Sequence, residues 1–234
     1  MAGDPDAPSV VTVSQSVNGP VLTWQYTGME TPGGFRVYRA VSDGEMQLLQ
    51  NEQFIFGNEN SYVDSSAIPG QVYRYAVMTV DLDGNSSSLS ESVSIVPGGT
   101  LVDNVTWKLS QSPIRIDGDI IVPEFYSLVV EPGVTVTFNQ TDNGVGGYDR
   151  NKCEVIVQGC LYAIGTEEQP IRFISGSSVP TRNDWSGIRI VKTDNQTPSV
   201  IKNTVISGAN VGTTDAGNNI SLLQLIMLHI EPIG

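Results

Sequence analysis

The sequence predicts an all-β chain in which a β-sandwich is followed by a short parallel β-helix. Up to residue 96, short runs of alternating apolar and polar residues are separated by turn signals about every ten residues, which is typical of a sandwich. Beyond residue 97, a strand, corner and strand unit returns about every 25 to 30 residues, which is typical of a solenoid. The 24 Gly, 13 Pro and 16% charged residues suit strands and turns better than helices.

The 234 residues suffice for two domains with a core each. Residues 1–6 are predicted to be a linker, residues 7–97 the sandwich and residues 98–212 the coils of the β-helix. Residues 213–234 form an irregular tail. This tail is either a cap over the last coil or a consequence of truncation or of the reading frame.

The predicted strands of the sandwich occupy residues 9–17, 20–26, 34–41, 46–51, 71–81 and 91–96. Since side chains alternate along a strand, one face of the fifth run carries Tyr73, Tyr75, Val77 and Thr79. Trp24 lies between apolar neighbours of the same face, so we interpret it as the central core aromatic and not as a binding residue.

One local pattern in the sandwich could bind a metal ion. Asp81, Asp83 and Asn85 offer alternate oxygens that could bind calcium, but an EF-hand loop would need Gly and Glu where Ser86 and Ser92 stand. A tight turn is therefore the favoured interpretation, and calcium is the one cofactor considered.

The two cysteines, Cys153 and Cys160, are expected to be reduced and buried. A strand-like VIV segment lies between them and holds them too far apart for a disulfide. A zinc site is not expected because it needs about four ligands and His229 is the only histidine.

Several of these residues together resemble a fibronectin type III domain. The family's strand B tryptophan corresponds to Trp24, its strand C pattern to residues 34–39 and its tyrosine corner to residues 68–73. The resemblance implies a seven-stranded sandwich that serves as a spacer or interaction module in extracellular proteins. No Arg-Gly-Asp adhesion motif is present.

The stretch SLVVEPGVTVTF, residues 127–138, shows the repeating unit of the second half most clearly. Gly133 can take the positive φ that a sharp corner needs, and Pro132 restricts the residue before it. The side chains predicted to point inward are Leu128, Val130, Val134, Val136 and Phe138. One such coil is not stable alone, so neighbouring coils must cover it.

This half resembles the right-handed parallel β-helix proteins of bacterial cell surfaces, in the pectate-lyase-like superfamily. The matching elements are Trp107, Ser112-Pro113-Ile114, Gly118-Asp119, Leu128 to Val134, Gly159 to Thr166, Pro170 to Phe173 and Trp185 to Ile188. They are structural elements that name no substrate. Cys160 departs from the pattern, because the family commonly has Thr or another small residue there.

The polar, Gly-rich stretch at residues 139–152 is the candidate ligand-binding loop, since loops that leave a solenoid at one corner form its binding surfaces. Tyr148, Asp149 and Arg150 could hold a sugar by ring stacking and hydrogen bonds. A solvated loop without a ligand is the alternative.

Charge and hydropathy restrict the partners and the location. The net charge of −13 excludes nucleic acid as a favoured partner and leaves polysaccharide or other surface proteins. The apolar run at residues 221–230 is too short to span a bilayer, so no membrane insertion is expected. The N-terminus has no signal peptide pattern, so the protein is cytoplasmic or an internal piece of an exported chain. The linker-like start favours the second, with an extracellular or cell-surface location.

An enzyme is not expected, although many parallel β-helices are polysaccharide lyases or hydrolases. Candidate acid, base or charge-neutralising groups are Asp117 with Asp119, Asp149 with Arg150 and Lys152, and Arg182 with Asp184 and Arg189. Known catalytic helices use more coils than this chain has. We expect a non-catalytic spacer, adhesion or carbohydrate-interaction module. The alternative is the N-terminal fragment of a lyase or hydrolase whose catalytic coils lie downstream.

Overall fold

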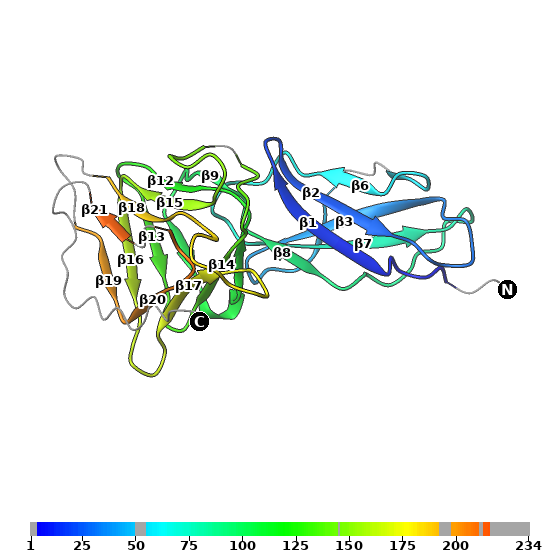
Figure 1. Ribbon diagram of the computed structural model, residues 1–234. Helices are drawn as coiled ribbons and strands as arrows, with labels where there is room; N and C mark the ends of the chain where they lie inside the picture. The colour runs from blue at the N-terminus through cyan, green and yellow to red at the C-terminus, as the bar shows by residue number, and fades with distance from the viewer. Residues whose placement is uncertain (1–3, 50–54, 145, 192–197, 211–212, 216–234) are drawn as a thin grey trace. The chain divides into compact units, whose positions relative to one another are not determined.

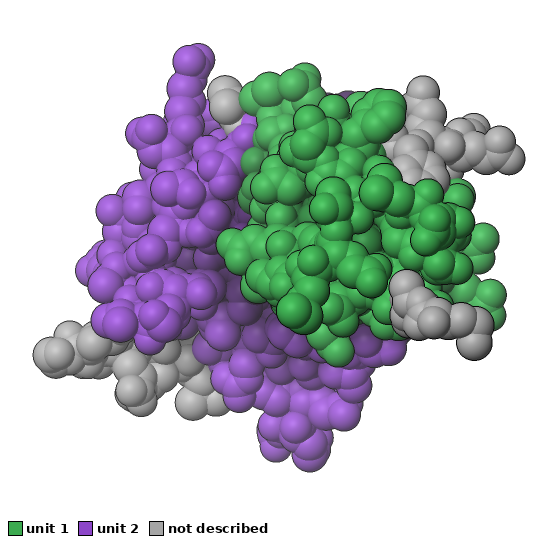
Figure 2. All heavy atoms as spheres, turned by 90° about the vertical axis from the view of Figure 1, so that its right-hand side faces the viewer, with its two compact units in different colours: residues 1–67, 73–95 green, residues 68–72, 96–234 purple. Residues whose placement is uncertain are grey.

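The computed structural model describes residues 4–49, 55–144, 146–191, 198–210 and 213–215. It is all-β, and it divides into two compact units, coloured separately in Figure 2. Unit 1 comprises residues 1–67 and 73–95, and unit 2 comprises residues 68–72 and 96–234. Residues 68–72, within the range predicted for the sandwich, therefore cluster with unit 2. None of the described residues belongs to a helix long and apolar enough to cross a membrane.

Unit 1 is a sandwich of two antiparallel sheets (Figure 1). The first sheet has the order β1-β2-β6, and the second has the order β4-β3-β7-β8 with β5 also paired to β3. The strands are β1 (Val10–Ser16), β2 (Gly19–Gln25), β3 (Gly34–Val41), β4 (Gln47–Leu48), β5 (Ile55–Phe56), β6 (Ser61–Val63), β7 (Tyr73–Val80) and β8 (Val93–Ile95). The predicted runs contain six of these strands, and the sequence analysis missed the short β5 and β6.

The core of unit 1 lies between the two sheets and follows the alternation of the sequence. The predicted face of β7 is buried, with Tyr73, Tyr75, Val77 and Thr79 at most 2% exposed. Trp24 is also buried, and its ring meets that of Phe35 edge-on with 5.3 Å between centroids. The prediction that Trp24 is a core aromatic is confirmed.

A buried carboxylate ties two strands and a turn of unit 1 together. Asp64 accepts hydrogen bonds from Arg39 Nη1 on β3 and from the Tyr75 hydroxyl on β7, both at 2.7 Å. The amide and hydroxyl of Ser66 donate to its other oxygen. Burial opposes ionisation of Asp64, but these hydrogen bonds and the charge of Arg39 hold its pKa below the ordinary value.

Unit 2 is a parallel β-helix whose strands form three parallel sheets (Figure 1). Their orders are β10-β13-β16-β19, β11-β14-β17-β20 and β9-β12-β15-β18-β21, so each coil contributes one strand to each sheet. The strands are β9 (Gly99–Thr100), β10 (Val105–Trp107), β11 (Ile114–Ile116), β12 (Ile120–Val122), β13 (Ser127–Val130), β14 (Thr135–Phe138), β15 (Glu154–Val157), β16 (Cys160–Ile164), β17 (Ile171–Ser175), β18 (Gly187–Ile190), β19 (Val200–Lys202), β20 (Thr204–Ile206) and β21 (Thr213–Asp215).

Rows of equivalent inward side chains fill the prism. Val105 pairs with Leu128 and Leu128 with Leu161 along one sheet, while Val155 pairs with Ile188 along another. The five inward residues predicted for the coil of β13 and β14 are all at most 2% exposed, which confirms them. Each Å² of apolar surface removed from water stabilises the fold by about 25 cal/mol. Because neighbouring coils cover each other's inward side chains, the stack forms a core that one coil lacks.

Aromatic rings stack inside the same prism. The ring of Phe138 lies flat on that of Trp185, with 3.9 Å between centroids and 3° between planes. The ring of Phe173 also stacks on that of Phe138, with 6.3 Å between centroids and 27° between planes. The indole nitrogens of Trp107 and Trp185 donate to the carbonyls of Gly70 and Ser207, so both rings are held at their polar edges.

The corner between β13 and β14 depends on Gly133. Its φ is +81°, and a Cβ at this position would lie 3.2 Å from the Cδ1 atom of Leu109. Left-handed backbone costs L-residues other than Gly about 1 kcal/mol or more. The Glu-Pro-Gly corner therefore turns the chain between two sheets at the position where the sequence predicted it.

We expect Gly133→Ala to lower the free energy of unfolding by about 1 kcal/mol, because alanine keeps the positive φ at a cost and its Cβ crowds Leu109. Urea denaturation measures this loss. Gly133→Asn is the control, since asparagine tolerates left-handed backbone better and should lose less. Equal losses in both variants would contradict the conformational explanation.

The two thiols do not form a disulfide. Cys153 and Cys160 are both free; Cys153 is buried, while Cys160 is half-buried at the start of β16. The expectation of two reduced thiols is confirmed, but the burial predicted for Cys160 is wrong in degree because its side chain points out of the prism, opposite to the inward Leu161.

The predicted tail lies mostly outside the described residues. Residues 213–215 form β21, which pairs with β18, and the remainder of the tail, with the apolar run at 221–230, is not described.

Candidate functional site

The loop that links β14 to β15 lies on the outer face of the sheet β9-β12-β15-β18-β21. Val155 and Ile188 point into the prism, so Glu154 and Arg189, one position away, point outward toward the loop. The loop is fixed to this face by its backbone: the amide of Asn143 donates to the carbonyl of Asp117, and the amides of Tyr148 and Asp149 donate to Glu154 Oε1.

The three residues predicted to bind a ligand occupy different environments in this loop. Tyr148 is 63% exposed, and the guanidinium of Arg189 lies 4.3 Å from its ring centroid. Asp149 accepts a hydrogen bond from the amide of Asn151, so one carboxylate oxygen serves the loop itself. Arg150 is exposed and makes no hydrogen bond or ion pair within the described part of the chain.

Two buried carboxylates lie beneath the loop. Asp119 is 2% exposed and Glu154 is 1% exposed. Asp119 Oδ1 accepts a hydrogen bond from the amide of Glu154 at 2.8 Å, whereas its Oδ2 is buried without a partner. Glu154 Oε2 lies 3.7 Å from Arg189 Nε on β18. The arrangement joins three coils, since Asp119 precedes β12, Glu154 begins β15 and Arg189 belongs to β18.

The electrostatics of Asp119 follow from this burial. Burial raises its pKa, and the nearby charges of Asp142 and Glu154 raise it further, while the backbone amides of Glu154 and Gly147 oppose them. The resulting pKa is about 7. A neutral carboxylic acid is therefore a major form of Asp119 near neutral pH.

The other carboxylates that the sequence analysis considered for catalysis have internal partners. Asp117 is fully buried and accepts two hydrogen bonds from the guanidinium of Arg115. Burial opposes ionisation of Asp184, but donors from Ser175, Thr181 and Gln140 lower its pKa to about 2. These two carboxylates stabilise loops and corners.

The predicted calcium site in unit 1 has the geometry of a turn. Asp81 Oδ1 accepts from the amides of Asp83 and Asn85, and its Oδ2 accepts from the side-chain amide of Asn85. In the described ranges, no three Asp, Glu, His or Cys side chains converge to hold a metal ion. Calcium at Asp81, Asp83 and Asn85 stays a prediction.

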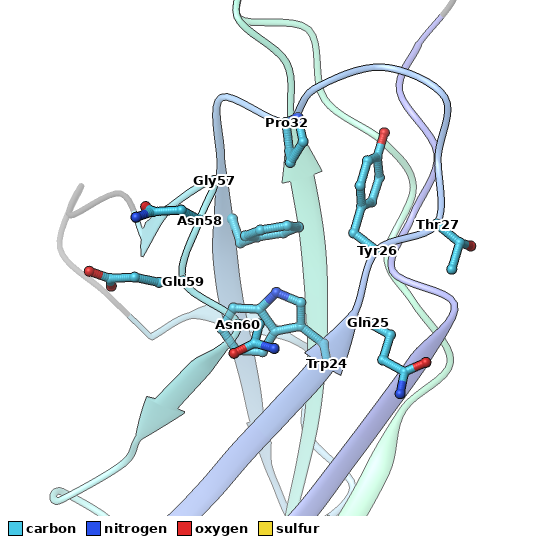
Figure 3. A pocket seen from close by; sticks show the side chains of 10 residues that line it. Trp24, Gln25, Tyr26, Thr27, Pro32, Gly57, Asn58, Glu59 and Asn60 are labelled. Carbon is cyan, nitrogen blue, oxygen red and sulfur yellow. The ribbon is translucent and has the colours of Figure 1, made fainter.

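Unit 1 also has a hollow of about 560 Å³ beside the end of β2 (Figure 3). Figure 3 shows Tyr26 on one side of it, Asn58 and Glu59 on the other, and Trp24 at its base. Trp24 Nε1 is buried and has no hydrogen-bond partner, but the solvent does not reach it and the indole packs edge-on against Phe35. The base of the hollow thus belongs to the core of unit 1.

Sequence reasoning found the exposed aromatic of the loop but missed what holds it. Tyr148 stands out because it is an aromatic residue in a Gly-rich polar stretch. Asp119 and Arg189 were considered only as members of local charge groups, and Glu154 was not considered. The missing signal was the register: once Ile120 is paired with Val155 and Val155 with Ile188, Asp119 and Glu154 become neighbours.

In comparisons with known proteins, this chain is similar to a distant relative in sequence and has low structural similarity to solved structures. No family model matches the chain. Over 162 residues the chain is 28% identical to Protein bark beetle of Drosophila melanogaster, which covers 66% of this chain and 5% of that protein. The chain thus spans a small fraction of this relative's length.

Solved structures with similarity to parts of the chain include both expected folds. A Fn3-like protein from Clostridium thermocellum is 19% identical with a TM-score of 0.34, over 42% of this chain and 97% of that one. A pectate lyase from Erwinia chrysanthemi in complex with tetragalacturonic acid is 13% identical with a TM-score of 0.33, over 89% of this chain and 78% of that one.

Proposed function

We propose that this chain is a non-catalytic module of an extracellular or cell-surface protein, and that the loop carrying Tyr148 binds a carbohydrate. The sandwich serves as a spacer, and the β-helix holds the loop on a rigid sheet face. Other surface proteins are the second class of partner that this architecture fits.

The observation that carries the proposal is the presentation of Tyr148. One side of its ring rests against the Arg189 guanidinium, and 63% of the residue faces solvent. An aromatic ring held in this way offers a flat apolar surface to the C–H face of a sugar, and its hydroxyl can bond to sugar oxygens. Arg150, exposed in the same loop, adds hydrogen-bond donors.

The burial of the acidic groups supports a non-catalytic role. A general acid or base must come within about 3 Å of the proton that it transfers, directly or through one water. Asp119 and Glu154 lie close together, but both are covered by the loop and at most 2% exposed. Asp117 and Asp184 are also at most 3% exposed and are occupied by internal donors.

A glycan array probed with the intact chain tests the proposal. We expect binding to a subset of glycans, and we expect Tyr148→Ala to weaken it at least tenfold, about 1.4 kcal/mol, because the stacking surface is lost. Tyr148→Phe should retain most of the affinity, since the ring remains.

Phe125→Ala is the matched control, because Phe125 is an aromatic residue of the same unit and 93% exposed, but lies in the turn before β13. Equal binding by Tyr148→Ala and the unchanged chain would discard the loop as the site. No binding to any glycan by the unchanged chain would discard the carbohydrate function and leave the spacer role.

A further inference from the structure

The backbone of Gly146 and Gly147 covers the buried carboxylate of Asp119 and brings it close to that of Glu154. A Cβ built on Gly147 would lie 2.0 Å from Glu154 Oε1 and 2.7 Å from Asp119 Oδ2. The distance between these two oxygens is therefore no greater than the sum of those two distances. Gly146 approaches the same Oδ2 atom, with a Cβ position 3.1 Å away. No side chain fits between the loop and the two carboxylates. Two ionised carboxylates this close and this buried would repel each other strongly.

The positive charges around Asp119 and Glu154 do not balance the negative charges of the nearby carboxylates. Asp142 contributes another carboxylate from the loop, and its Oδ2 is also buried without a partner. On the flanking strands, Arg189 faces Glu154 and Arg115 is engaged by Asp117. The other titratable or charged groups on these elements are the Cys153 thiol, whose pKa is raised by burial and then by Asp142, and the loop residues Tyr148, Asp149, Arg150 and Lys152. The ammonium of Lys152 donates to the carbonyl of Asn183.

A proton fits this site better than a divalent metal ion. Among the residues that the structure describes, no three acidic, histidine or cysteine side chains converge to hold a metal, and Arg189 already brings a positive charge to Glu154. A proton on Asp119 Oδ2 removes one negative charge and turns an acceptor into a donor in the space next to Gly147, where Glu154 Oε1 also lies. Glu154 Oε1 is the same atom that accepts the amides of Tyr148 and Asp149.

We propose that a proton on Asp119 latches the glycine loop, residues 142–144 and 146–149, onto the β-helix, and that the latch weakens when this proton leaves. The proposal adds a pH-dependent regulation to the ligand site. It rests on the proposed function only because the latched loop carries Tyr148.

The direction of the pH dependence follows from linkage. In the latched state the pKa of Asp119 is about 7, whereas a carboxyl released into water has a pKa of about 4. The latched state therefore binds the proton more tightly, and the latch is strongest below pH ~4. Its equilibrium constant falls by up to about tenfold per pH unit as the pH rises from ~4 to ~7, and it is constant above that.

Amide hydrogen exchange of the ¹⁵N-labelled intact chain measures the latch without any sugar. The reporters are the amides of Tyr148 and Asp149, which donate to Glu154. We expect their protection, corrected for intrinsic exchange, to fall by up to about 50-fold between pH 5 and 7 and to level off above pH ~8. The amide shift of Glu154, which donates to Asp119, should titrate with a midpoint near 7.

Two variants separate the latch from a general effect of pH. Asp119→Asn keeps this side chain uncharged and able to donate a hydrogen bond at every pH, so protection should be high and independent of pH. Asp142→Asn removes one of the charges that raise the pKa of Asp119, so the midpoint should move to lower pH while the latch remains. Glu124→Gln, an exposed carboxyl of the same unit, should change neither.

Three outcomes would overturn the proposal. The exchange protection of the two amides could be independent of pH in the unchanged chain, or it could still fall with pH in Asp119→Asn. Protection could also recover at pH 8 when calcium is added but not when EDTA is added. The last would assign the latch to a metal ion. Because exchange is measured without glycans, a negative glycan array together with a pH step would refute the carbohydrate function and leave the latch intact.

Discussion

Phe138→Ala is expected to lower the free energy of unfolding of unit 2 by about 4 kcal/mol, enough to remove a large part of the stability of a typical domain. Phe138 is fully buried, and its ring stacks on those of Trp185 and Phe173 from the next coil. The variant loses the transfer free energy of the ring, the stacking on Trp185 and the contacts of the cavity lining. Urea denaturation followed by near-ultraviolet circular dichroism measures the change.

Two controls accompany this variant. Phe138→Leu retains most of the apolar volume and should lose clearly less. Phe125→Ala removes the same side chain from an exposed position and should change the stability by less than about 0.5 kcal/mol. A loss below about 1 kcal/mol in Phe138→Ala would show that the stacked coils do not share a tightly packed interior.

Asp64→Asn is expected to destabilise unit 1 by about 3 kcal/mol at pH 7. The carboxylate is 1% exposed and holds Arg39, Tyr75 and Ser66. An amide in its place removes the charge that balances Arg39 and turns an NH₂ group toward other donors. Thermal unfolding of the two proteins at the same pH measures the difference.

The pH dependence of this difference provides a second check. The folded state holds the pKa of Asp64 below that of the unfolded chain, so its contribution is complete above about pH 4 and is lost as the pH falls toward the folded pKa. The gap between the two proteins should therefore narrow in acid. Asp83→Asn changes an exposed carboxylate in a turn of the same unit and is the control that should stay close to the unchanged chain. A gap that is constant down to pH 2 would contradict the assignment.

The fold could be predicted from the sequence to the extent that local alternation encodes it. Residues 127–138 alternate on both sides of Gly133, and the inward set from Leu128 to Phe138 is buried as predicted. Strands of two or three residues, such as β5 and β6, carry too little alternation to be distinguished from loops. Their place is set by pairing with β3 and β2, which is a property of the tertiary structure.

The candidate site was predictable only in its exposed part. Tyr148 is marked by its composition-biased surroundings, whereas Asp119, Glu154 and Arg189 meet through the register of three successive coils. The loop inserted between β14 and β15 changes the spacing of that repeat, so sequence distance alone does not align the three residues. The same loop also buries the carboxylates, and burial is the main cause of the raised pKa of Asp119.

The in-register pairing of the coils makes this half of the protein a candidate for extension by duplication. Leu128 lies beside Leu161 and Val136 beside Phe173, so a second copy of one coil would meet equivalent neighbours above and below. Each added copy would lengthen the stack by about 4.8 Å, the distance between neighbouring strands. Protein engineers could thus use unit 2 as a molecular ruler whose length is set by the number of copies of one segment.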